Sequence, residues 1–385
     1  MKWKNKGHEY DDIAKEICDD RIKYYVWGAG ILGESFYRDF KQKIRILAFI
    51  DSNVKKQGTK LEDIYILSPE EIDLREDEKI IIATGWVKQV TDSLKLKGYQ
   101  KNRHFYLLDE FSTIYMMYKY NKLHVEKIDM FCNTRCTLRC KHCSALIPYN
   151  RNGRNYTFEE MKQNVDMLFK WVDYVHILSF SGGDAMVNPN LPRIIEYVGN
   201  EYRWKQVQDF ELYTNAIILP DEKMLGIWKK YDVIIRFTNY TKNVPHKQKI
   251  KQMIEILEEN KLKYDYVQFE KWLDMGYPQP SNGLVSENEL IEHCKQCTPV
   301  ISTCLNDGKI FYCSPSCGAD SSGLFEHEPT DGFDLSEYSE SRKREFMEFY
   351  TGFSEKGYPS YCKRCYGFFN NNNRLIEVAE QMEIG

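Results

Sequence analysis

Three cysteines in a short stretch have the types and spacing to carry out chemistry. Cys136, Cys140 and Cys143 follow one another with C-x3-C-x2-C spacing. Thiolates at this spacing can ligate three irons of a [4Fe–4S] cube, and because such cubes usually take four cysteines, the fourth iron stays open. An open coordination position is what a reactive metal site needs. The triplet therefore predicts a reactive iron–sulfur centre.

Two other interpretations of the triplet compete with this one. A structural zinc site needs a fourth ligand, which His142 or Cys132 could supply. A disulfide framework is typical of small secreted proteins. The present chain has 385 residues and an N-terminus without the apolar run of a signal peptide, so it does not fit the disulfide interpretation.

The triplet is also the signature of the radical S-adenosylmethionine (radical SAM) enzymes, and the chain resembles this family from about residue 125 to its end. The resemblance implies that the open iron chelates the amino and carboxylate groups of SAM. One electron from the cluster then cleaves SAM to methionine and a 5′-deoxyadenosyl radical. A flavodoxin or ferredoxin is the implied electron donor. The resemblance assigns only the three later cysteines, so Cys132 is left out of the site.

A second motif lies some forty residues after the triplet. Gly182, Gly183 and Asp184 stand where the family has the Gly-Gly-Glu motif that receives the SAM amino group, with Asp in place of Glu. Glycines let the backbone approach a ligand closely. The resemblance also implies that His142 packs near the adenine. By their positions at strand ends, four further residues are candidates for SAM ribose, SAM carboxylate or substrate contacts: Thr214, Asn215, Arg236 and Asn239.

Alternating β and α segments must position these residues. Apolar runs predict strands over 127–131, 175–180, 210–214, 233–237 and 264–269, with amphipathic helices between them. Repeated β/α units predict a parallel sheet or barrel, in which ligands bind at the carboxyl ends of the strands. Together with the resemblance, this predicts an α/β protein whose residues 119–290 form a partial (β/α)6 TIM-type barrel.

The pattern of residues 1–118 predicts a separate Rossmann-like domain. A strand over 23–27 leads into Gly28, Gly30 and Gly33, a helical stretch follows, and a strand over 44–50 ends at Asp51. This G-x-G-x-x-G pattern lets the backbone approach a phosphate at a helix N-terminus. The segment resembles small N-terminal domains of sugar-modifying and acyl-transferring enzymes, some of which bind nucleotide-sugars. A scaffold or vestigial site is the alternative, and hydride transfer to NAD is not predicted.

Residues 291–385 hold seven of the twelve cysteines. Cys297, Gly308, Cys313 and the pair Cys362 and Cys365 resemble the "twitch" extension of radical SAM enzymes, in which four cysteines bind a second [4Fe–4S] cluster. Cys297 and Cys304 compete for the fourth ligand position, and Cys294 and Cys317 are also available. Two clusters, or a zinc ribbon built from two C-x2-C pairs, are the alternatives. The larger SPASM extension needs further cysteines after Cys365, which the chain lacks.

The composition of the chain gives no support to some classes of function. The net charge of −4 gives no electrostatic reason to expect a nucleic-acid or membrane partner. The sequence has no stretch as long as a membrane span, and a cytoplasmic location is expected.

The function predicted from these features is hydrogen abstraction from a small polar substrate by the deoxyadenosyl radical. Oxidation results if the second cluster accepts an electron, and epimerisation results if a thiol such as Cys304 or Cys317 returns a hydrogen. The Rossmann-like segment favours a sugar or nucleotide-sugar as substrate. The alternatives are a peptide-modifying maturase and, from another class, a non-catalytic electron-transfer or zinc-binding protein.

Overall fold

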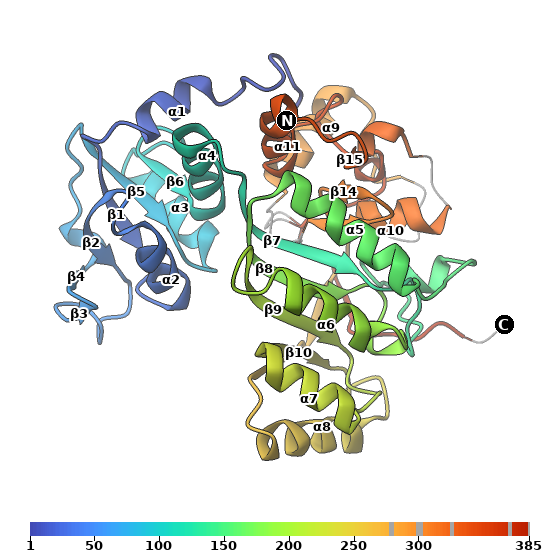
Figure 1. Ribbon diagram of the computed structural model, residues 1–385. Coiled ribbons are helices and arrows are strands. Elements are labelled where there is room, and N and C mark those ends of the chain that lie inside the picture. The colour runs from blue at the N-terminus through green and yellow to red at the C-terminus, as the bar shows by residue number, and fades with distance from the viewer. Residues whose placement is uncertain (277–280, 298–302, 324–326, 369–371, 384–385) are drawn as a thin grey trace. The chain divides into compact units, whose positions relative to one another are not determined.

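The computed structural model describes residues 1–276, 281–297, 303–323, 327–368 and 372–383 (Figure 1). The chain forms two compact units. The smaller unit is His8–Lys122, and the larger one combines Met1–Gly7 with Leu123–Gly385. The further division of the larger unit at residue 290 stays a prediction. No described helix is long and apolar enough to cross a membrane.

The smaller unit is a doubly wound sheet of the predicted Rossmann-like type. Its strands lie in the order β3-β4-β2-β1-β5-β6, and all neighbours pair in parallel except β3 with β4. The elements are α1 (Asp11–Ile17), β1 (Lys23–Trp27), α2 (Ile31–Phe40), β2 (Arg45–Ile50), β3 (Lys60–Leu61), β4 (Ile64–Leu67), β5 (Glu78–Ile82), α3 (Val87–Leu96), β6 (Phe105–Leu107) and α4 (Leu108–Tyr120). The predicted strands are confirmed, and the helical stretch predicted after the glycines is α2, with Gly30 as its N-cap.

The larger unit contains the predicted strand and helix alternation. Strands β7 (His124–Phe131), β8 (Tyr174–Ser181), β9 (Val207–Thr214), β10 (Val233–Asn239) and β11 (Tyr264–Gln268) pair in parallel, each with the next. The helices between them are α5 (Phe158–Trp171), α6 (Leu191–Glu201), α7 (Glu222–Tyr231) and α8 (Lys247–Glu259). Thr157 caps α5 through a capping box with Glu160, as the sequence predicts. This is the mixed α/β architecture of a partial TIM-type barrel.

One face of this sheet is buried against helices. Figure 1 shows α5, α6 and α7 along one side of the strands. Successive side chains of a strand point to opposite faces. In β9, Phe210 and Leu212 are completely buried, whereas Tyr213 on the other face is 37% exposed. The apolar core thus fixes the sheet from one side and leaves the opposite face free for polar residues.

The C-terminal segments extend the sheet of this unit and add a separate pair of strands. β13 (Cys304–Asn306) pairs in parallel with β7, and β14 (Lys309–Phe311) and β15 (Gly332–Asp334) extend the same sheet. β12 (Lys271–Leu273) and β16 (Leu375–Glu377) form a separate antiparallel pair. The remaining helices are α9 (Glu287–Gln296), α10 (Ser314–Ser322) and α11 (Lys343–Tyr350). The sixth parallel strand of the sheet is therefore β13, which comes from the cysteine-rich segment.

Candidate active site

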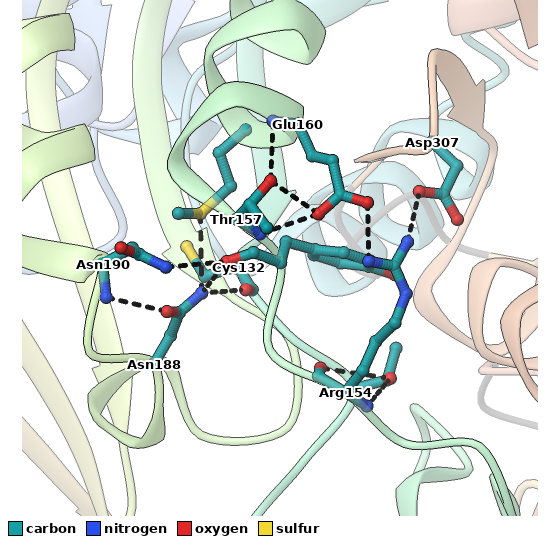
Figure 2. A network of polar contacts seen from close by, with 10 residues as sticks. Cys132, Arg154, Thr157, Glu160, Asn188, Asn190 and Asp307 are labelled. Atoms are coloured by element: carbon teal, nitrogen blue, oxygen red, sulfur yellow. Dashed lines mark hydrogen bonds and ion pairs between the residues drawn. The ribbon is translucent and has the colours of Figure 1, made fainter.

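The loop that carries the cysteine triplet is fixed at its base, where it leaves β7. Thr134 N donates to the carbonyl of Arg154 at 2.9 Å, and Tyr156 N donates to the carbonyl of Cys132 at 3.2 Å. Figure 2 shows Asn188 beside this base, where its amide donates to the Cys132 carbonyl at 2.6 Å. Cys132 itself is fully buried. It therefore lies in the base of the loop, apart from the triplet.

The same base is fixed on its outer side by Arg154. Its guanidinium lies 2.6 Å from the carboxylate of Glu160 and 3.6 Å from that of Asp307, as Figure 2 shows. Glu160 also completes the capping box of α5. The loop, the first barrel helix and the β13–β14 turn are thus tied together by one arginine.

The three thiols of the triplet gather in one cluster of apolar side chains. Cys136, Cys140 and Cys143 pack with Leu138 and Val378, among others. Burial raises the pKa of Cys136 and of Cys140 to about 12 and raises that of Cys143. As free thiols they would stay protonated, but a coordinating metal deprotonates a thiol outright. The three sulfurs therefore fit the ligand set of a metal cluster better than a group of free thiols.

Side-chain amides donate to two of these sulfurs. Asn215 Nδ2 lies 3.4 Å from Cys136 Sγ and 2.9 Å from Thr137 Oγ1. Gln381 Nε2 lies 3.3 Å from Cys140 Sγ, and its Oε1 accepts from Arg139 N at 2.8 Å. Hydrogen bonds to cluster sulfurs tune the reduction potential of iron–sulfur centres. Both amides are therefore placed to orient thiolate ligands.

Replacing Gln381 with Glu is expected to weaken iron retention about 10- to 100-fold, the usual cost of losing an outer-shell partner. A carboxylate would face the Cys140 sulfur without a proton to donate. The measurement is the iron content of the anaerobically reconstituted protein during challenge with a chelator. Gln208→Glu is the matched control, because Gln208 is exposed on β9. Equal iron retention in Gln381→Glu and wild type would contradict the assigned contact.

The Gly-Gly-Asp loop after β8 lies directly against the triplet loop. Gly183 N donates to Asn133 Oδ1 at 3.1 Å, and Asp184 N donates to the Arg135 carbonyl at 2.9 Å. A Cβ on Gly182 would lie 2.3 Å from the Asn133 carbonyl oxygen, and one on Gly183 would lie 2.0 Å from that of Arg135. Both glycines are thus required by contact between the two loops.

Asp184 links this loop to the end of β9. Its side chain is 1% exposed, and burial raises the pKa of its carboxyl group. One oxygen accepts from Met186 N at 3.0 Å, and the other accepts from Thr214 Oγ1 and Asn215 N, both at 3.1 Å. Asn215 in turn contacts the Cys136 sulfur. The carboxylate of Asp184 therefore positions Asn215 beside the triplet.

The other residues expected to contact SAM bond to neighbouring side chains. His142 Nε2 is 3.7 Å from a carboxylate oxygen of Glu380. Asn239 Nδ2 donates to Gln268 at 3.1 Å, at the carboxyl end of β10. Arg236 lies further back in β10 and pairs with Glu211 at 2.7 Å. The roles of His142, Arg236 and Asn239 toward SAM stay predictions.

Five cysteines of the C-terminal segment line an apolar pocket. They are Cys294, Cys297, Cys313, Cys362 and Cys365. Backbone N–H groups of Phe368 and Gly367 donate to the sulfurs of Cys297 and Cys365, at 3.4 and 3.2 Å.

Cys304 and Cys317 lie outside this second set. Their thiols hydrogen-bond to each other, and Cys304 Sγ is also 3.4 Å from Ser314 Oγ. Both residues are fully buried. Of the two cysteines that competed for the fourth ligand position, the structure therefore places Cys297 at the pocket and Cys304 elsewhere.

Within the described part of the chain, no three His, Cys, Asp or Glu side chains converge as ligands of one metal ion. A cube differs from a single ion in this respect, because each thiolate ligates a different iron and the sulfurs stand further apart. Both thiol sets consist of sulfur donors gathered in apolar surroundings. The triplet thiols therefore fit a [4Fe–4S] cluster, and a cluster at the second set stays a prediction.

Comparison with protein families identifies the domain that contains the triplet. Residues 130–261 match the radical SAM superfamily. The chain carries a radical SAM domain. A radical SAM enzyme of this kind implies a [4Fe–4S] cluster and SAM, in agreement with the donor set of the triplet loop. Residues 20–105 match a second family, described as C2185-like, N-terminal.

Individual relatives of the chain are distant. A probable GTP 3′,8-cyclase from Methanococcus maripaludis is 29% identical over 85 residues, which is 22% of this chain and 27% of that protein. The match thus spans about a quarter of the relative's length.

Solved structures show weak similarity. BtrN, in complex with AdoMet and 2-DOIA, is 17% identical with a TM-score of 0.41, over 67% of this chain and 96% of that one. The enzyme anSMEcpe, with bound AdoMet and Cp18Cys peptide, is 11% identical with a TM-score of 0.35, over 49% and 74%. SuiB of Streptococcus suis, bound to S-adenosylmethionine, is 15% identical with a TM-score of 0.31, over 60% and 72%.

Sequence reasoning missed two residues beside the triplet of this radical SAM enzyme. Gln381 lies more than two hundred residues away and belongs to no local motif. Tyr240 packs against the thiol cluster and directly follows Asn239 at the end of β10. Its place at a strand end is the same signal that indicated Asn239, so Tyr240 could have been found by that rule.

Proposed function

We propose that this radical SAM enzyme abstracts a hydrogen atom from a polar, hydroxyl-bearing substrate of sugar type, and that oxidation follows. When bound, the cluster and SAM supply the 5′-deoxyadenosyl radical. The observation that carries the proposal is a network of charged and hydroxyl side chains on the sheet face that no barrel helix covers. This face leads directly to the triplet loop.

The network joins residues of four strands. Lys127 Nζ on β7 lies 2.7 Å from Glu211 Oε2 and 2.8 Å from the Tyr213 hydroxyl, both on β9. Glu211 Oε1 accepts from Arg236 Nε on β10 at 2.7 Å. Arg236 also pairs with Asp265 on β11 at 2.6 Å. The four charges therefore form one connected chain across the open face.

The network is placed close to the triplet by the pleat of β9. Glu211 and Tyr213 alternate along β9 and share one face, and Asn215 directly follows the strand. Asn215 contacts Cys136, and Tyr213 is two residues away, or about 7 Å along a strand. A small substrate that contacts Tyr213 would therefore lie within reach of a radical formed beside Cys136.

The charges favour hydroxyl ligands over apolar ones. Burial alone would raise the pKa of Glu211, but the charges of Lys127 and Arg236 hold it below its ordinary value. Glu211 therefore stays ionised and accepts hydrogen bonds. Burying such pairs without function usually costs stability relative to apolar residues. The side chains of Lys127 and Arg236 are 25% and 33% exposed, so these donors can be reached from solvent, which supports a site that binds several polar groups.

The placement of the remaining cysteines supports oxidation over epimerisation. Cys304 and Cys317 are the thiols expected to return a hydrogen, but they are fully buried and hydrogen-bonded to each other. We propose Cys297, Cys313, Cys362 and Cys365 as ligands of a second [4Fe–4S] cluster, with Cys294 beside them. Such a cluster would accept the electron that the substrate radical gives up, and the substrate would lose a proton.

A peptide substrate is the second candidate, because β11 is an edge strand. Tyr266 and Val267 of this strand are 47% and 42% exposed. An extended peptide can add to such an edge by backbone hydrogen bonds. The polar network, which reaches β11 through Asp265, gives a peptide backbone less to bind than it gives a sugar, so we favour the sugar.

The proposed function is tested by anaerobic reconstitution with iron and sulfide, followed by dithionite, SAM and a panel of sugars and short peptides. A sugar should raise formation of 5′-deoxyadenosine and yield a product two hydrogens lighter. Product of unchanged mass with solvent deuterium at carbon would indicate epimerisation. Stimulation by peptides alone would favour the second candidate.

Replacing Tyr213 with Phe is expected to lower kcat/KM for the stimulating sugar about 10-fold, because a hydroxyl that bonds Lys127 and Glu211 is removed. SAM cleavage without substrate should be unchanged. The readout is 5′-deoxyadenosine with and without the sugar. Tyr174→Phe is the matched control, since that hydroxyl bonds exposed Gln208. An unchanged kcat/KM in Tyr213→Phe would place the substrate elsewhere.

A further inference from the structure

The smaller unit has an open pocket of about 590 Å³ at the carboxyl edge of its sheet. Residues that follow β1, β2 and β5 line it together with the first turns of α3. This is the edge where doubly wound sheets bind ligands. The glycine-rich turn at Gly28 belongs to the same edge, so the pocket and the motif form one site.

A carboxylate already occupies the position expected for a phosphate. Asp51 Oδ2 accepts a hydrogen bond from Ala29 N, within the glycine-rich turn, at 3.0 Å. Lys56 Nζ lies 3.3 Å from the same carboxylate and donates to the Ala29 carbonyl at 2.8 Å. Phosphates bind such turns through these backbone N–H groups. The turn is thus closed by the chain's own anion and its own cation.

The two outer glycines of the motif serve the fold. A Cβ on Gly28 would lie 2.3 Å from the Ala83 carbonyl oxygen, and one on Gly33 would lie 1.8 Å from that of Gly28. Gly28 also has φ +122°. Tight packing of strand, turn and helix therefore explains both glycines without a phosphate ligand.

The pocket lining carries two carboxylates. They belong to Asp51 and Glu70, and none of its thirteen described lining residues is Lys or Arg. Lys56 compensates the charge of Asp51, which leaves the charge of Glu70 to repel a phosphate, whereas both carboxylates accept hydrogen bonds from hydroxyl groups. The lining also offers uncharged polar groups: Ser52, Gln57, Thr84, Gln89 and Ser93.

An exposed tryptophan gives the pocket a flat apolar side. Trp86 lies at the N-cap of α3 and is 70% exposed. Val54, which also lines the pocket, is 77% exposed. Large exposed apolar side chains beside a pocket are typical of binding sites. An aromatic face next to hydrogen-bond acceptors suits a ring that carries hydroxyl groups on its edge.

We propose that this pocket binds an uncharged, hydroxyl-bearing ring, as in a sugar or a nucleoside, which stacks on Trp86 and donates to Asp51 and Glu70. The site goes beyond the proposed reaction and does not depend on it. It differs from a dinucleotide or nucleotide-sugar site because Asp51 accepts the backbone N–H of the glycine-rich turn that would otherwise bind a phosphate.

The first experiment titrates the full-length protein, without SAM or reductant, with uridine, glucose, UDP and glucose 1-phosphate. Binding is followed by calorimetry and tryptophan fluorescence. At least one uncharged compound should bind more tightly than its phosphorylated counterpart, and Trp86→Ala should weaken it about 10-fold, as expected for a lost stacking contact. Trp204→Ala is the control, since Trp204 is 62% exposed in the other unit. Tighter binding of the phosphorylated compounds, or no binding, would overturn the proposal.

The second experiment uses Asp51→Asn, which removes the charge and keeps the shape. If the carboxylate excludes phosphate, the variant should bind UDP or glucose 1-phosphate more tightly than wild type does. If Asp51 instead holds the ribose of a nucleotide, the variant should bind UDP more weakly, and the proposal is wrong. Neither titration involves radical formation, so failure here is distinct from failure of the proposed reaction.

Discussion

Replacing Cys136, Cys140 or Cys143 with Ser is expected to lower reductive cleavage of SAM by more than about 100-fold, since losing an outer-shell partner alone costs 10- to 100-fold. Each thiolate would ligate a separate iron, so one loss leaves the cube with two protein ligands. A serine hydroxyl is a harder and weaker ligand for iron than a thiolate. The measurement is 5′-deoxyadenosine formed after anaerobic reconstitution, dithionite and SAM, together with the iron content.

The matched control for this series is Cys132→Ser in the same loop. Cys132 is fully buried at the base of the loop, where its backbone carbonyl accepts from Asn188. This variant is expected to lose some stability but to retain the spectrum of the reduced SAM-binding cluster. If Cys132→Ser removed that signal while one triplet variant kept it, the assigned ligand set would be wrong.

A second control separates the two proposed clusters. Cys297→Ser is expected to remove the iron of the second cluster and to leave cleavage of SAM measurable. Cys304→Ser should leave the iron content of both clusters unchanged, because the Cys304 thiol hydrogen-bonds to Cys317 and Ser314 instead. Loss of four irons in Cys304→Ser with full iron in Cys297→Ser would restore Cys304 as the fourth ligand.

The order and the type of the main helices and strands could be predicted from the sequence. Alternating apolar runs with capping signals such as Thr157 and Glu160 act locally, so strands and helices of both units could be predicted from them. The triplet and the Gly-Gly-Asp motif could be predicted for the same reason, because each is continuous in the chain and carries its own geometric requirement.

Contacts between distant segments could not be predicted in this way. Gln381 reaches Cys140 because the backbone around residue 381 pairs directly with the triplet loop, and nothing near residue 381 in the sequence indicates that pairing. Cys297 and Cys304 gave equally good spacings, and only packing separated them. Asp51 fits a ribose-binding pattern by position, yet its side chain closes the glycine-rich turn instead. In each case the deciding contact depends on tertiary structure.

Replacing Gly183 with Ala is expected to destabilise the larger unit by at least about 2 kcal/mol, within the range for strongly disruptive single changes. The added Cβ would lie 2.0 Å from the Arg135 carbonyl oxygen and 2.5 Å from its carbon. Both atoms belong to backbone, which cannot move aside as a flexible side chain can. Gly183 has no left-handed φ, so the whole effect comes from this contact.

The clash also predicts loss of function beyond the loss of stability. To relieve it, the Gly-Gly-Asp loop must move away from the triplet loop and give up the bonds from Gly183 to Asn133 and from Asp184 to Arg135. Asp184 would then no longer hold Asn215 beside Cys136. Iron retention should therefore fall together with the midpoint of urea unfolding.

Gly226→Ala is the matched control, because a Cβ at this position in α7 meets nothing within 4 Å. Alanine favours a helix interior over glycine by about 1 kcal/mol, so this variant should be as stable as wild type or more so. Both variants are compared by urea unfolding of the apo protein and by iron content after reconstitution. If Gly183→Ala matched Gly226→Ala in both measurements, contact between the two loops would not be what holds the triplet in place.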